Sequence, residues 1–430
     1  MYFAPDSIPA LDDRLVPPVV LGTAHLTGFA YQGNGYDSLV ERIGPNRTDG
    51  GADTEAARLY DTAIACQLAF RRAEGLDLQD QALERSQLFR VGAGADKPLR
   101  LLALAGPGDL MVNTPLDFIT NAIDVRLDLL YLRADRPLPP VIPDHDVAFF
   151  AQSEADEATL VRLKALFRAW PRPVLNDPGL LPNLARDTLA QSLAGVPGIR
   201  SPEAVAVTRA ALEAHLQSGE SIGCDYPCLI RPSGSHAGAG LALTETPAEL
   251  AAYLRRTFAQ TFFLTAFENY ISPDGFYRKS RVVFIDRRPF LCHKAISRNW
   301  MVHYLNAGMI ESADKRAEEA YAMANFDTGF GRRHEAAFEA LHDRLGFDYY
   351  SIDCAETRDG RLLVFEADTA AIIHQMDPAD RFPYKQPQMR KVFAAFETML
   401  RRRADRDCTG FGWRARLERI GAERAPFALR

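Results

Sequence analysis

Short apolar runs that alternate with helix-forming segments dominate the chain from residue 99 onward. Four of them read as strands: "LRLLALA" (99–105), "VRLDLLYL" (125–132), "DVAFFA" (146–151) and "PVLN" (173–176). Strands that alternate with helices favour a parallel α/β sheet, whose ligands bind beyond the carboxyl ends of the strands. The loop 106–114 is therefore a candidate substrate wall, with a plain connection as the alternative. Thr114 is expected to cap the helix that follows it.

The composition is that of an ordinary globular protein. The chain has 430 residues, of which 47% are hydrophobic and 25% charged, and a net charge of −6 gives no general case for binding nucleic acid or a membrane. No apolar run reaches the ~18 residues of a membrane span, and the first residues do not read as a signal peptide. The six scattered cysteines are expected to be reduced thiols in a cytoplasmic protein, and the CxxxC spacing of Cys224 and Cys228 lacks the second pair of a zinc site.

The remaining segments divide into helical and strand-rich regions. Residues 54–73 and 76–89 predict two amphipathic helices hinged at Gly75, which are more typical of a cap on the fold than of a repeat array. Beyond residue 226, strands are expected over 226–232, 241–244, 261–268, 277–285 and 289–297. Thr246 and Glu249 form a capping box for a helix, and further helices are expected over 311–345 and 386–403. The Arg-rich tail reads as a solvated helix end.

The segment "YYSIDCAETRDGRLLVFEAD" (349–368) predicts a hairpin with three carboxylates on one face. The dipeptide Asp359-Gly360 favours a two-residue type I′ turn, which would place Asp353 opposite Glu366 and Asp368 opposite Ser351. Like charges that face each other are destabilising, so either the patch is solvated with a raised pKa or a cation lies there. Carboxylates without His or Cys favour Mg²⁺ or Mn²⁺ over zinc. The alternative is an exposed acidic sheet face.

The segment "RKSRVVFIDRRPFLCHK" (278–294) predicts a second, basic hairpin. With Asp286-Arg287 as its loop, Lys279, Arg281 and Lys294 would share one face. Cations that face carboxylates across a bound phosphate are the layout that phosphoryl transfer needs. Separate surface charges are the alternative.

A third candidate is the glycine-rich loop "SGSHAGAG" (233–240) between two expected strands. Such a loop can bring backbone N–H groups close to phosphate oxygens, although it matches neither the P-loop nor the dinucleotide-binding pattern. A flexible hairpin tip is the alternative. Arg231 ends an apolar strand just before the loop, and an arginine at a buried strand end requires an anion, either a protein carboxylate or a ligand phosphate.

In their order along the chain, these motifs resemble the ATP-grasp superfamily, in particular its glutathione-synthetase and RimK-like group. The resemblance covers roughly residues 99–400 and rests on "PVLNDPGLLPNLARD", "YPCLIRPSGSHAGAGLALTETPAEL", "FFLTAFENYI", "YRKSRVVFI" and "GFDYYSIDCAETRDGRLLVFEAD". It implies an α/β (α+β) fold in which a parallel-sheet pre-domain precedes two subdomains that grip ATP. The expected divisions are a mainly helical extension (1–92), a pre-domain (93–185), a subdomain with the glycine-rich loop (186–258), a subdomain with the metal site (259–400) and a tail (401–430).

The resemblance also implies roles for individual residues. The phosphates of ATP would be bound by Arg186, Arg231, Ser233, Gly234, Ser235, His236, Gly238 and Gly240, and its adenosine by Thr265, Phe267 and Glu268. Mg²⁺ would be bound by Asp353, Glu366 and Asp368. The catalytic residues would be Arg281 and Lys294. Candidate substrate residues are Asn113, Thr114, His293, Arg298, His303 and His374, with local packing as the alternative for the last four. Two features depart from the family: Arg186 and Arg231 stand where lysine is usual, and Asp368 stands where asparagine is common.

The activity that the resemblance implies is an ATP- and Mg-dependent joining of a carboxylate to an amine. An acyl-phosphate would form first, the amine would capture it, and ADP and phosphate would be released. The substrates would be small-molecule or peptide carboxylates and amines, and a homodimer is compatible with the family. Two alternatives stay open: a small-molecule kinase on the same fold, and a non-catalytic nucleotide-binding regulator.

Overall fold

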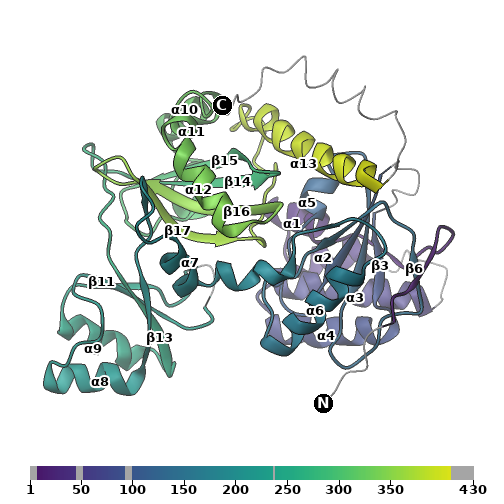
Figure 1. Ribbon diagram of the computed structural model, residues 1–430, viewed down its shortest axis with the longest axis horizontal. Helices are drawn as coiled ribbons and strands as arrows, with labels where there is room; N and C mark the ends of the chain where they lie inside the picture. The colour runs from purple at the N-terminus through teal and green to yellow at the C-terminus, as the bar shows by residue number, and fades with distance from the viewer. Residues whose placement is uncertain (1–6, 45–51, 93–98, 236–237, 408–430) are drawn as a thin grey trace.

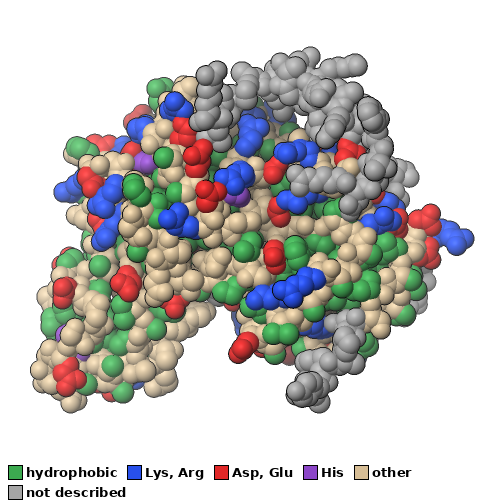
Figure 2. All heavy atoms as spheres, in the orientation of Figure 1, with side chains coloured by type: hydrophobic (Ala, Val, Ile, Leu, Met, Phe, Trp, Pro, Cys, Tyr) green, Lys and Arg blue, Asp and Glu red, His purple; other side chains and the backbone are tan. Residues whose placement is uncertain are grey.

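The computed structural model describes residues 7–44, 52–92, 99–235 and 238–407, so His236 and the tail beyond 407 lie outside the described residues. The described chain is a mixed α/β protein with sheets of six, five and four strands and one short two-stranded sheet. Figure 1 shows the four-stranded sheet with its two helices as a lobe that projects from the rest. Figure 2 shows that the molecular surface is indented between that lobe and the domain of the six-stranded sheet. None of the described helices is long and apolar enough to cross a membrane.

The six-stranded sheet forms the first domain. Its order is β2 (Val19–Val20), β3 (Leu88–Val91), β5 (Val125–Tyr131), β4 (Leu99–Ala105), β7 (Val147–Phe150) and β8 (Val174–Leu175). The four strands predicted from residue 99 onward are confirmed as β4, β5, β7 and β8, and they are parallel to one another. Since β2 and β3 come from the first 92 residues and join the same sheet, the expected boundary at residue 92 cuts through one sheet.

The helices of this domain come from both sides of that expected boundary. They are α1 (Thr23–Tyr31), α2 (Tyr36–Ile43), α3 (Ala52–Leu68), α4 (Arg72–Arg85), α5 (Asp117–Thr120) and α6 (Glu157–Ala169). The prediction of a hinge at Gly75 is wrong: Gly75 lies inside α4, and a Cβ there would be 2.8 Å from the Ala63 carbonyl oxygen of α3. The chain instead turns at Phe70, which has a φ of 61°. Gly75 therefore permits close packing of two helices.

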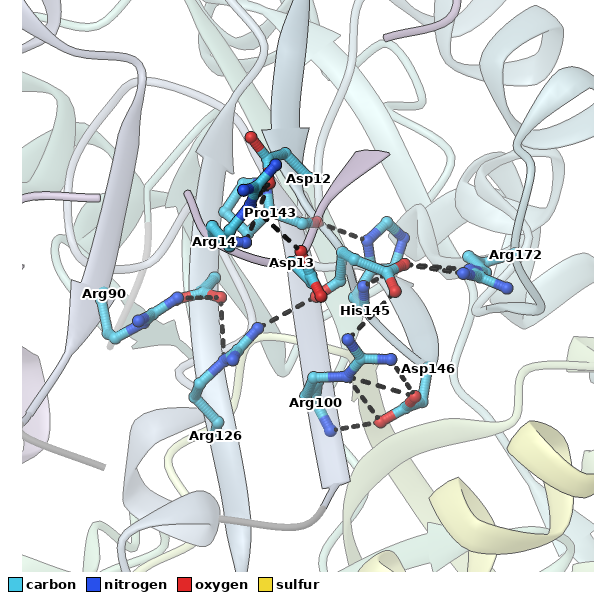
Figure 3. Close-up of polar contacts among 12 residues, drawn as sticks. Asp12, Asp13, Arg14, Arg90, Arg100, Arg126, Pro143, His145, Asp146 and Arg172 are labelled. Carbon is cyan, nitrogen blue, oxygen red and sulfur yellow. Dashed lines mark hydrogen bonds and ion pairs between the residues drawn. The ribbon is translucent and has the colours of Figure 1, made fainter. Parts of the chain in front are cut away.

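A network of charged side chains lies at the end of the six-stranded sheet where the strands β4 and β5 begin. Figure 3 shows Arg90, Arg126 and Arg100 in a row on the neighbouring strands β3, β5 and β4. Asp128 pairs with Arg90 at 2.6 Å and with Arg126 at 3.2 Å. Asp146 pairs with Arg100 at 2.6 Å. Ligands of parallel sheets bind at the opposite edge, so this network has a structural role.

His145 completes the same edge beside the short sheet of β1 (Ala10–Asp12) and β6 (Val141–Pro143). The indole N–H of Trp170 donates to His145 Nε2 at 3.0 Å, and His145 Nδ1 lies 3.0 Å from the Pro143 carbonyl oxygen. Because Nε2 accepts, Nδ1 carries the proton and the ring is neutral. Burial lowers the pKa of His145, in agreement with that assignment.

The four-stranded antiparallel sheet has the order β10 (Ala204–Thr208), β13 (Thr261–Ala266), β11 (Cys228–Pro232) and β12 (Ala242–Thr244). Helices α8 (Arg209–Ser218) and α9 (Pro247–Arg256) cover one face, and their apolar core includes Leu212 and Phe262. Thr246 caps α9, since its side chain accepts from the Glu249 N–H. The Glu249 carboxylate accepts from the Glu245 N–H rather than from Thr246, so only half of the predicted capping box forms.

The five-stranded sheet has the order β15 (Arg288–Ser297), β14 (Tyr277–Ile285), β16 (Tyr349–Glu356), β17 (Leu362–Asp368) and β9 (Ile199–Arg200). Around it lie η1 (Pro178–Leu184), α7 (Arg186–Leu193), η2 (Tyr304–Asn306), α10 (Ala313–Ala324), α11 (Phe330–Arg333), α12 (Glu335–Leu345) and α13 (Lys385–Asp407). Helix α13 bridges the two larger sheets, because the ring of Phe396 packs against Phe149 of β7 and Tyr349 of β16. Asn176 also joins them through two 2.8 Å hydrogen bonds to the backbone of Tyr349.

Candidate functional site

In the hairpin of β16 and β17, the residues that carry the three carboxylates pair across the strands as predicted. Asp353 lies directly opposite Glu366, and Asp368 lies opposite Ser351. The predicted two-residue turn is wrong, however. The Gly360 N–H donates to the Thr357 carbonyl and the Thr357 N–H to the Arg361 carbonyl, so the turn has three residues, with Gly360 alone at positive φ.

A β-bulge restores the register that the longer turn shifts. Cys354 pairs with Val364 while Asp353 pairs with Glu366, so Phe365 is the extra residue. A bulge changes the direction in which neighbouring side chains point. Here Phe365 and Glu366 line the same cavity although they are adjacent in the strand. The bulge thus supplies an aromatic ring beside a carboxylate.

The acidic patch is neutralised by cations of the protein itself. Arg281 Nε donates to Asp353 Oδ1 at 2.8 Å, and Lys279 Nζ donates to Asp353 Oδ2 at 2.8 Å. Arg186 of α7 donates to Glu366 Oε2 at 2.7 Å. Within the described residues no Lys, Arg or His nitrogen lies within 4 Å of the Asp368 carboxylate.

These contacts set the protonation states of the patch. Burial opposes the charge of Asp353, but Arg281 and Lys279 outweigh it and hold the pKa of Asp353 well below its usual range. Burial raises the pKa of Asp368 to about 6, and the negative charge of Glu366 adds to the effect. Asp368 is therefore the carboxylate of the three that most needs an external cation.

The donor set suits Mg²⁺ in chemistry, although no group of three His, Cys, Asp or Glu side chains in the described part of the chain is arranged to hold a metal. Carboxylate oxygens are the hard ligands that Mg²⁺ prefers, and the ion usually takes only one or two of them together with substrate phosphates. Glu366 and Asp368 fit that requirement, because Asp368 has no cationic partner within 4 Å among the described residues and Glu366 is partly exposed. Asp353 is already engaged at both oxygens.

The basic hairpin has the predicted loop, but its side chains are not all on the predicted faces of the sheet. Asp286 and Arg287 both have positive φ, as a type I′ turn requires. A bulge at Cys292 then pairs Arg281 with His293 and Ser280 with Lys294. The prediction that Lys294 shares a face with Lys279 and Arg281 is wrong: Lys294 Nζ lies on the other face, 2.7 Å from Glu318 of α10. His293 takes its place opposite Arg281.

A cavity lies between the four-stranded and five-stranded sheets, and we call it the inter-sheet cavity. Its walls combine apolar side chains such as Leu229 and Phe263 with charged ones. Residues expected at a nucleotide site that line it are Arg186, Arg231, Gly238, Thr265, Phe267 and Glu268, and Lys279, His303 and Glu366 lie in the same wall. The structure thus brings together most of the predicted nucleotide-binding side chains.

A second hollow, which we call the Asp368 cavity, adjoins the first. The two share Arg186, Arg231, Phe263 and Glu366 in their walls. The Asp368 cavity is also lined by Gly234 and Ser235 of the glycine-rich loop and by Met111 and Ser153 from the carboxyl edge of the six-stranded sheet. Arg186 and Arg231 therefore line both cavities, and the second of these also reaches Asp368.

Arg231 has no carboxylate of the described residues within 4 Å. Its guanidinium instead donates to the hydroxyl of Ser235 at 3.1 Å and to the carbonyl oxygen of that residue. Burial, together with the nearby charge of Arg186, lowers the pKa of Arg231 to about 10. A half-buried cation without a carboxylate partner among the described residues is a candidate position for a ligand anion.

His303 joins the glycine-rich loop to the inter-sheet cavity. A Cβ on Gly238 would lie 2.6 Å from His303 Nε2, so the loop packs directly on the imidazole. The backbone of His303 is fixed at the start of η2, where the Asn306 N–H donates to the His303 carbonyl oxygen at 3.2 Å and the His303 N–H donates to Asn306 Oδ1 at 3.2 Å.

Several candidate substrate residues lie elsewhere. Asn113 bonds the backbone of Gly106 through both side-chain atoms, and the Thr114 hydroxyl bonds the Ala151 carbonyl oxygen instead of capping α5. Both line a third, separate cavity. Arg298 lies 4.5 Å above the ring of Phe276, and His374 lies beside Tyr31 of α1 with their ring centroids 6.4 Å apart.

No family model and no curated protein matches the chain. Among solved structures, an ATP-grasp RimK domain protein from Sphaerobacter thermophilus DSM 20745 is similar, with 21% identity, a TM-score of 0.41, and coverage of 71% of this chain and 98% of that one. A D-alanine–D-alanine ligase from Bacillus anthracis, complexed with ATP, has 13% identity, a TM-score of 0.42, and coverage of 73% and 100%. The VanG D-Ala:D-Ser ligase from Enterococcus faecalis has 14% identity, a TM-score of 0.42, and coverage of 69% and 99%.

Sequence reasoning missed part of the site. Phe365, Trp300 and Met301 line the inter-sheet cavity, and Arg200 of β9 holds the carboxylate of Glu268 at 2.7 Å. Strict alternation along β17 would place Phe365 on the face opposite Glu366, and the bulge turns it toward the cavity. Arg200 could have been found only from the parallel pairing of β9 with β17, which is not a local signal.

Proposed function

We propose that the protein is an ATP- and Mg-dependent ligase that joins a carboxylate to an amine. The observation that carries the proposal is that Arg186, Arg231 and Lys279 line one cavity together with apolar side chains, while the adjoining Asp368 cavity shares Arg186 and Arg231. The apolar side chains suit a purine ring, and the cationic side chains suit a polyphosphate. The ATP-grasp resemblance implies phosphate-binding roles for Arg186 and Arg231 and metal-binding roles for Glu366 and Asp368.

In this proposal each residue has a definite task. Arg231 and the backbone of the glycine-rich loop bind the phosphates, and Glu268, held by Arg200, accepts from the ribose hydroxyls. Glu366 and Asp368 would hold Mg²⁺, which supplies positive charge to the transferred phosphate. Arg186 pairs with Glu366 in this structure. Once Mg²⁺ occupies Glu366, Arg186 would contact the same phosphate instead.

The reaction has two steps. A carboxylate oxygen of the substrate attacks the γ-phosphorus of ATP, the bond from that phosphorus to the bridging oxygen breaks, and ADP leaves. The amine nitrogen then attacks the acyl carbon, phosphate leaves with the C–O electron pair, and the amine loses a proton. Arg281, held on Asp353, is placed beside the metal carboxylates to stabilise the charge of the transferred group.

Two other functions fit the same fold, and one observation favours the second of them. A kinase would use the same nucleotide site with a hydroxyl acceptor. A non-catalytic regulator is favoured by Asp353, whose two oxygens are both occupied by protein cations. Such pairing is compatible with nucleotide binding that leads to no transfer.

The test measures ADP and phosphate release from Mg-ATP in the presence of pooled carboxylates and pooled amines. A ligase releases phosphate only when both pools are present, and Glu366→Gln abolishes the release. A kinase releases ADP together with a phosphorylated product and no free phosphate. Tight binding of Mg-ATP without any release supports the regulator and contradicts the ligase.

A further inference from the structure

The cavity that holds Asn113 and Thr114 has no role in the proposed reaction. It lies between the six-stranded sheet and helices α3 and α4, and we call it the tyrosine cavity because Tyr60 and Tyr131 line it. Its volume is about 60 Å³, which is room for a few heavy atoms. Asp109 lines it as well and exposes 26% of its side chain, so the cavity reaches the surface there.

Two buried hydroxyls in this cavity are incompletely satisfied. Tyr60 Oη and Tyr131 Oη lie 2.8 Å apart, and the two residues are 4% and 5% exposed. Two hydroxyls offer two protons, and this hydrogen bond uses one of them. The structure gives them no other hydrogen bond among the described residues, so one O–H proton has no acceptor. A buried donor without an acceptor is costly unless a ligand or a water provides one.

A buried carboxylate lines the same cavity. Asp117 is 6% exposed, and no Lys, Arg or His nitrogen of the described residues lies within 4 Å of it. Its Oδ2 accepts from the Ala24 N–H at 2.6 Å at the start of α1, and the backbone N–H groups of Thr23, Asp117 and Phe118 also lower its pKa. Burial raises the pKa of Asp117 to about 6, so the group is still mostly ionised above pH 7. Burial raises the pKa of both tyrosines, and the negative charge of Asp117 adds a smaller effect, which places the three groups within electrostatic reach.

We propose that the tyrosine cavity binds a small protonated amine that carries one hydroxyl or carbonyl oxygen. The ammonium group would donate to Asp117 and to a tyrosine oxygen, and the ligand oxygen would accept the spare tyrosine proton. A buried carboxylate without a cation selects for positive charge, and the cavity volume limits the ligand to a few heavy atoms. Amino acids are disfavoured, since their carboxylate would face Asp117. This site is independent of the proposed ligase function.

The test is isothermal titration of the full chain at pH 7.5 with ethanolamine, which has both required groups. Saturable binding is expected for the wild type, and ethylene glycol and potassium chloride at equal concentration should not bind. Asp117→Asn and Tyr131→Phe should each weaken the affinity about tenfold or more, which corresponds to the loss of 1.4 kcal/mol. Arg231→Gln, a variant of the nucleotide site, should bind ethanolamine as the wild type does.

Three results would overturn the assignment. The first is the absence of saturable ethanolamine binding up to tens of millimolar. The second is equal affinity in the wild type and in Tyr131→Phe, which keeps the apolar packing of the cavity. The third is equal binding of potassium, which would make the cavity an inorganic cation site. A failure of ATP turnover has no bearing on any of these outcomes, so the two proposals fail separately.

Discussion

At the scale of single residues, the contact of Gly238 with His303 is the part of the proposed phosphate loop that substitution tests best. A Cβ at Gly238 would meet His303 Nε2 at 2.6 Å, and the φ of +75° adds backbone strain. We expect Gly238→Ala to raise the KM for ATP about tenfold, since the loop must move away from the imidazole. Steady-state kinetics or nucleotide titration measures the change.

Gly234 provides the matched control for that experiment. It has a φ of +72°, yet a Cβ there would meet nothing within 4 Å. Gly234→Ala therefore has the same backbone penalty without the contact, and its KM should change much less. Equal effects of the two substitutions would mean that loop strain, and not the imidazole contact, governs binding.

Asp117 gives the molecule a dependence of stability on pH. Its folded-state pKa of about 6 is above the ordinary value, so the native state binds the proton more tightly than the unfolded chain does. The free energy of unfolding contributed by this group is highest below the unfolded pKa and falls as pH rises through about 6. Asp117→Asn should remove this loss, on the order of 2–3 kcal/mol.

Thermal melts of the wild type and of Asp117→Asn between pH 4 and pH 8 check this prediction. The melting temperature of the variant should fall less than that of the wild type as the pH rises. Parallel pH profiles for the two proteins would show that the proton of Asp117 is not bound more tightly in the native state.

At the scale of elements, the Asp128 cluster should hold β3 and β5 together. Asp128 is 1% exposed and pairs with both Arg90 and Arg126, so Asp128→Asn leaves buried arginine charge uncompensated. The expected loss in the free energy of unfolding is about 3–5 kcal/mol. Chemical denaturation measures it, with Asp135→Asn as control.

Asp135 pairs with Arg133 at 2.8 Å, but its side chain is 61% exposed. Exposed pairs contribute about 1 kcal/mol or less, so the control should be nearly neutral. Similar losses in the two variants would contradict a special role for burial at Asp128.

The two hairpins show which part of the element structure is encoded locally. The turn at Asp286-Arg287 was predicted correctly, because two residues between apolar strands leave few other conformations. The opposition of Asp353 and Glu366 was also predicted correctly, but two errors cancelled: the turn is one residue longer, and the bulge at Phe365 removes the shift. In the basic hairpin the turn was predicted correctly, so nothing offset the register shift caused by the bulge at Cys292, and Lys294 was assigned to the wrong face.

Bulges of this kind have no glycine or other local signal here. Phe365 and Cys292 are apolar residues within mostly apolar strands, so the sequence alone does not distinguish them from regularly paired positions. The parallel strands and the glycine-rich loop could be predicted because periodicity and composition are local properties. Contacts such as Arg200 with Glu268 and Gly238 with His303 join distant segments, and only the assembled fold reveals them.

At the scale of the whole molecule, helix α13 joins the domain of the six-stranded sheet to the proposed catalytic sheet. The side chain of Phe396 is fully buried between Phe149 and Tyr349. Phe396→Ala should lower the free energy of unfolding by about 3–5 kcal/mol, because a large cavity opens in the core. Tyr321→Ala, at a side chain that is 72% exposed, is the control and should change stability by about 0.5 kcal/mol or less.

The central claim is that the inter-sheet cavity binds ATP with its phosphates at Arg231. The most direct measurement is equilibrium binding of Mg-ATP and of adenosine to the wild type, to Arg231→Gln and to Arg298→Gln, whose side chain lies on Phe276. The claim predicts that Arg231→Gln weakens ATP at least tenfold and leaves adenosine unchanged, while Arg298→Gln affects neither ligand. Equal affinity of the wild type and Arg231→Gln for ATP, or the absence of ATP binding to the wild type, would contradict it.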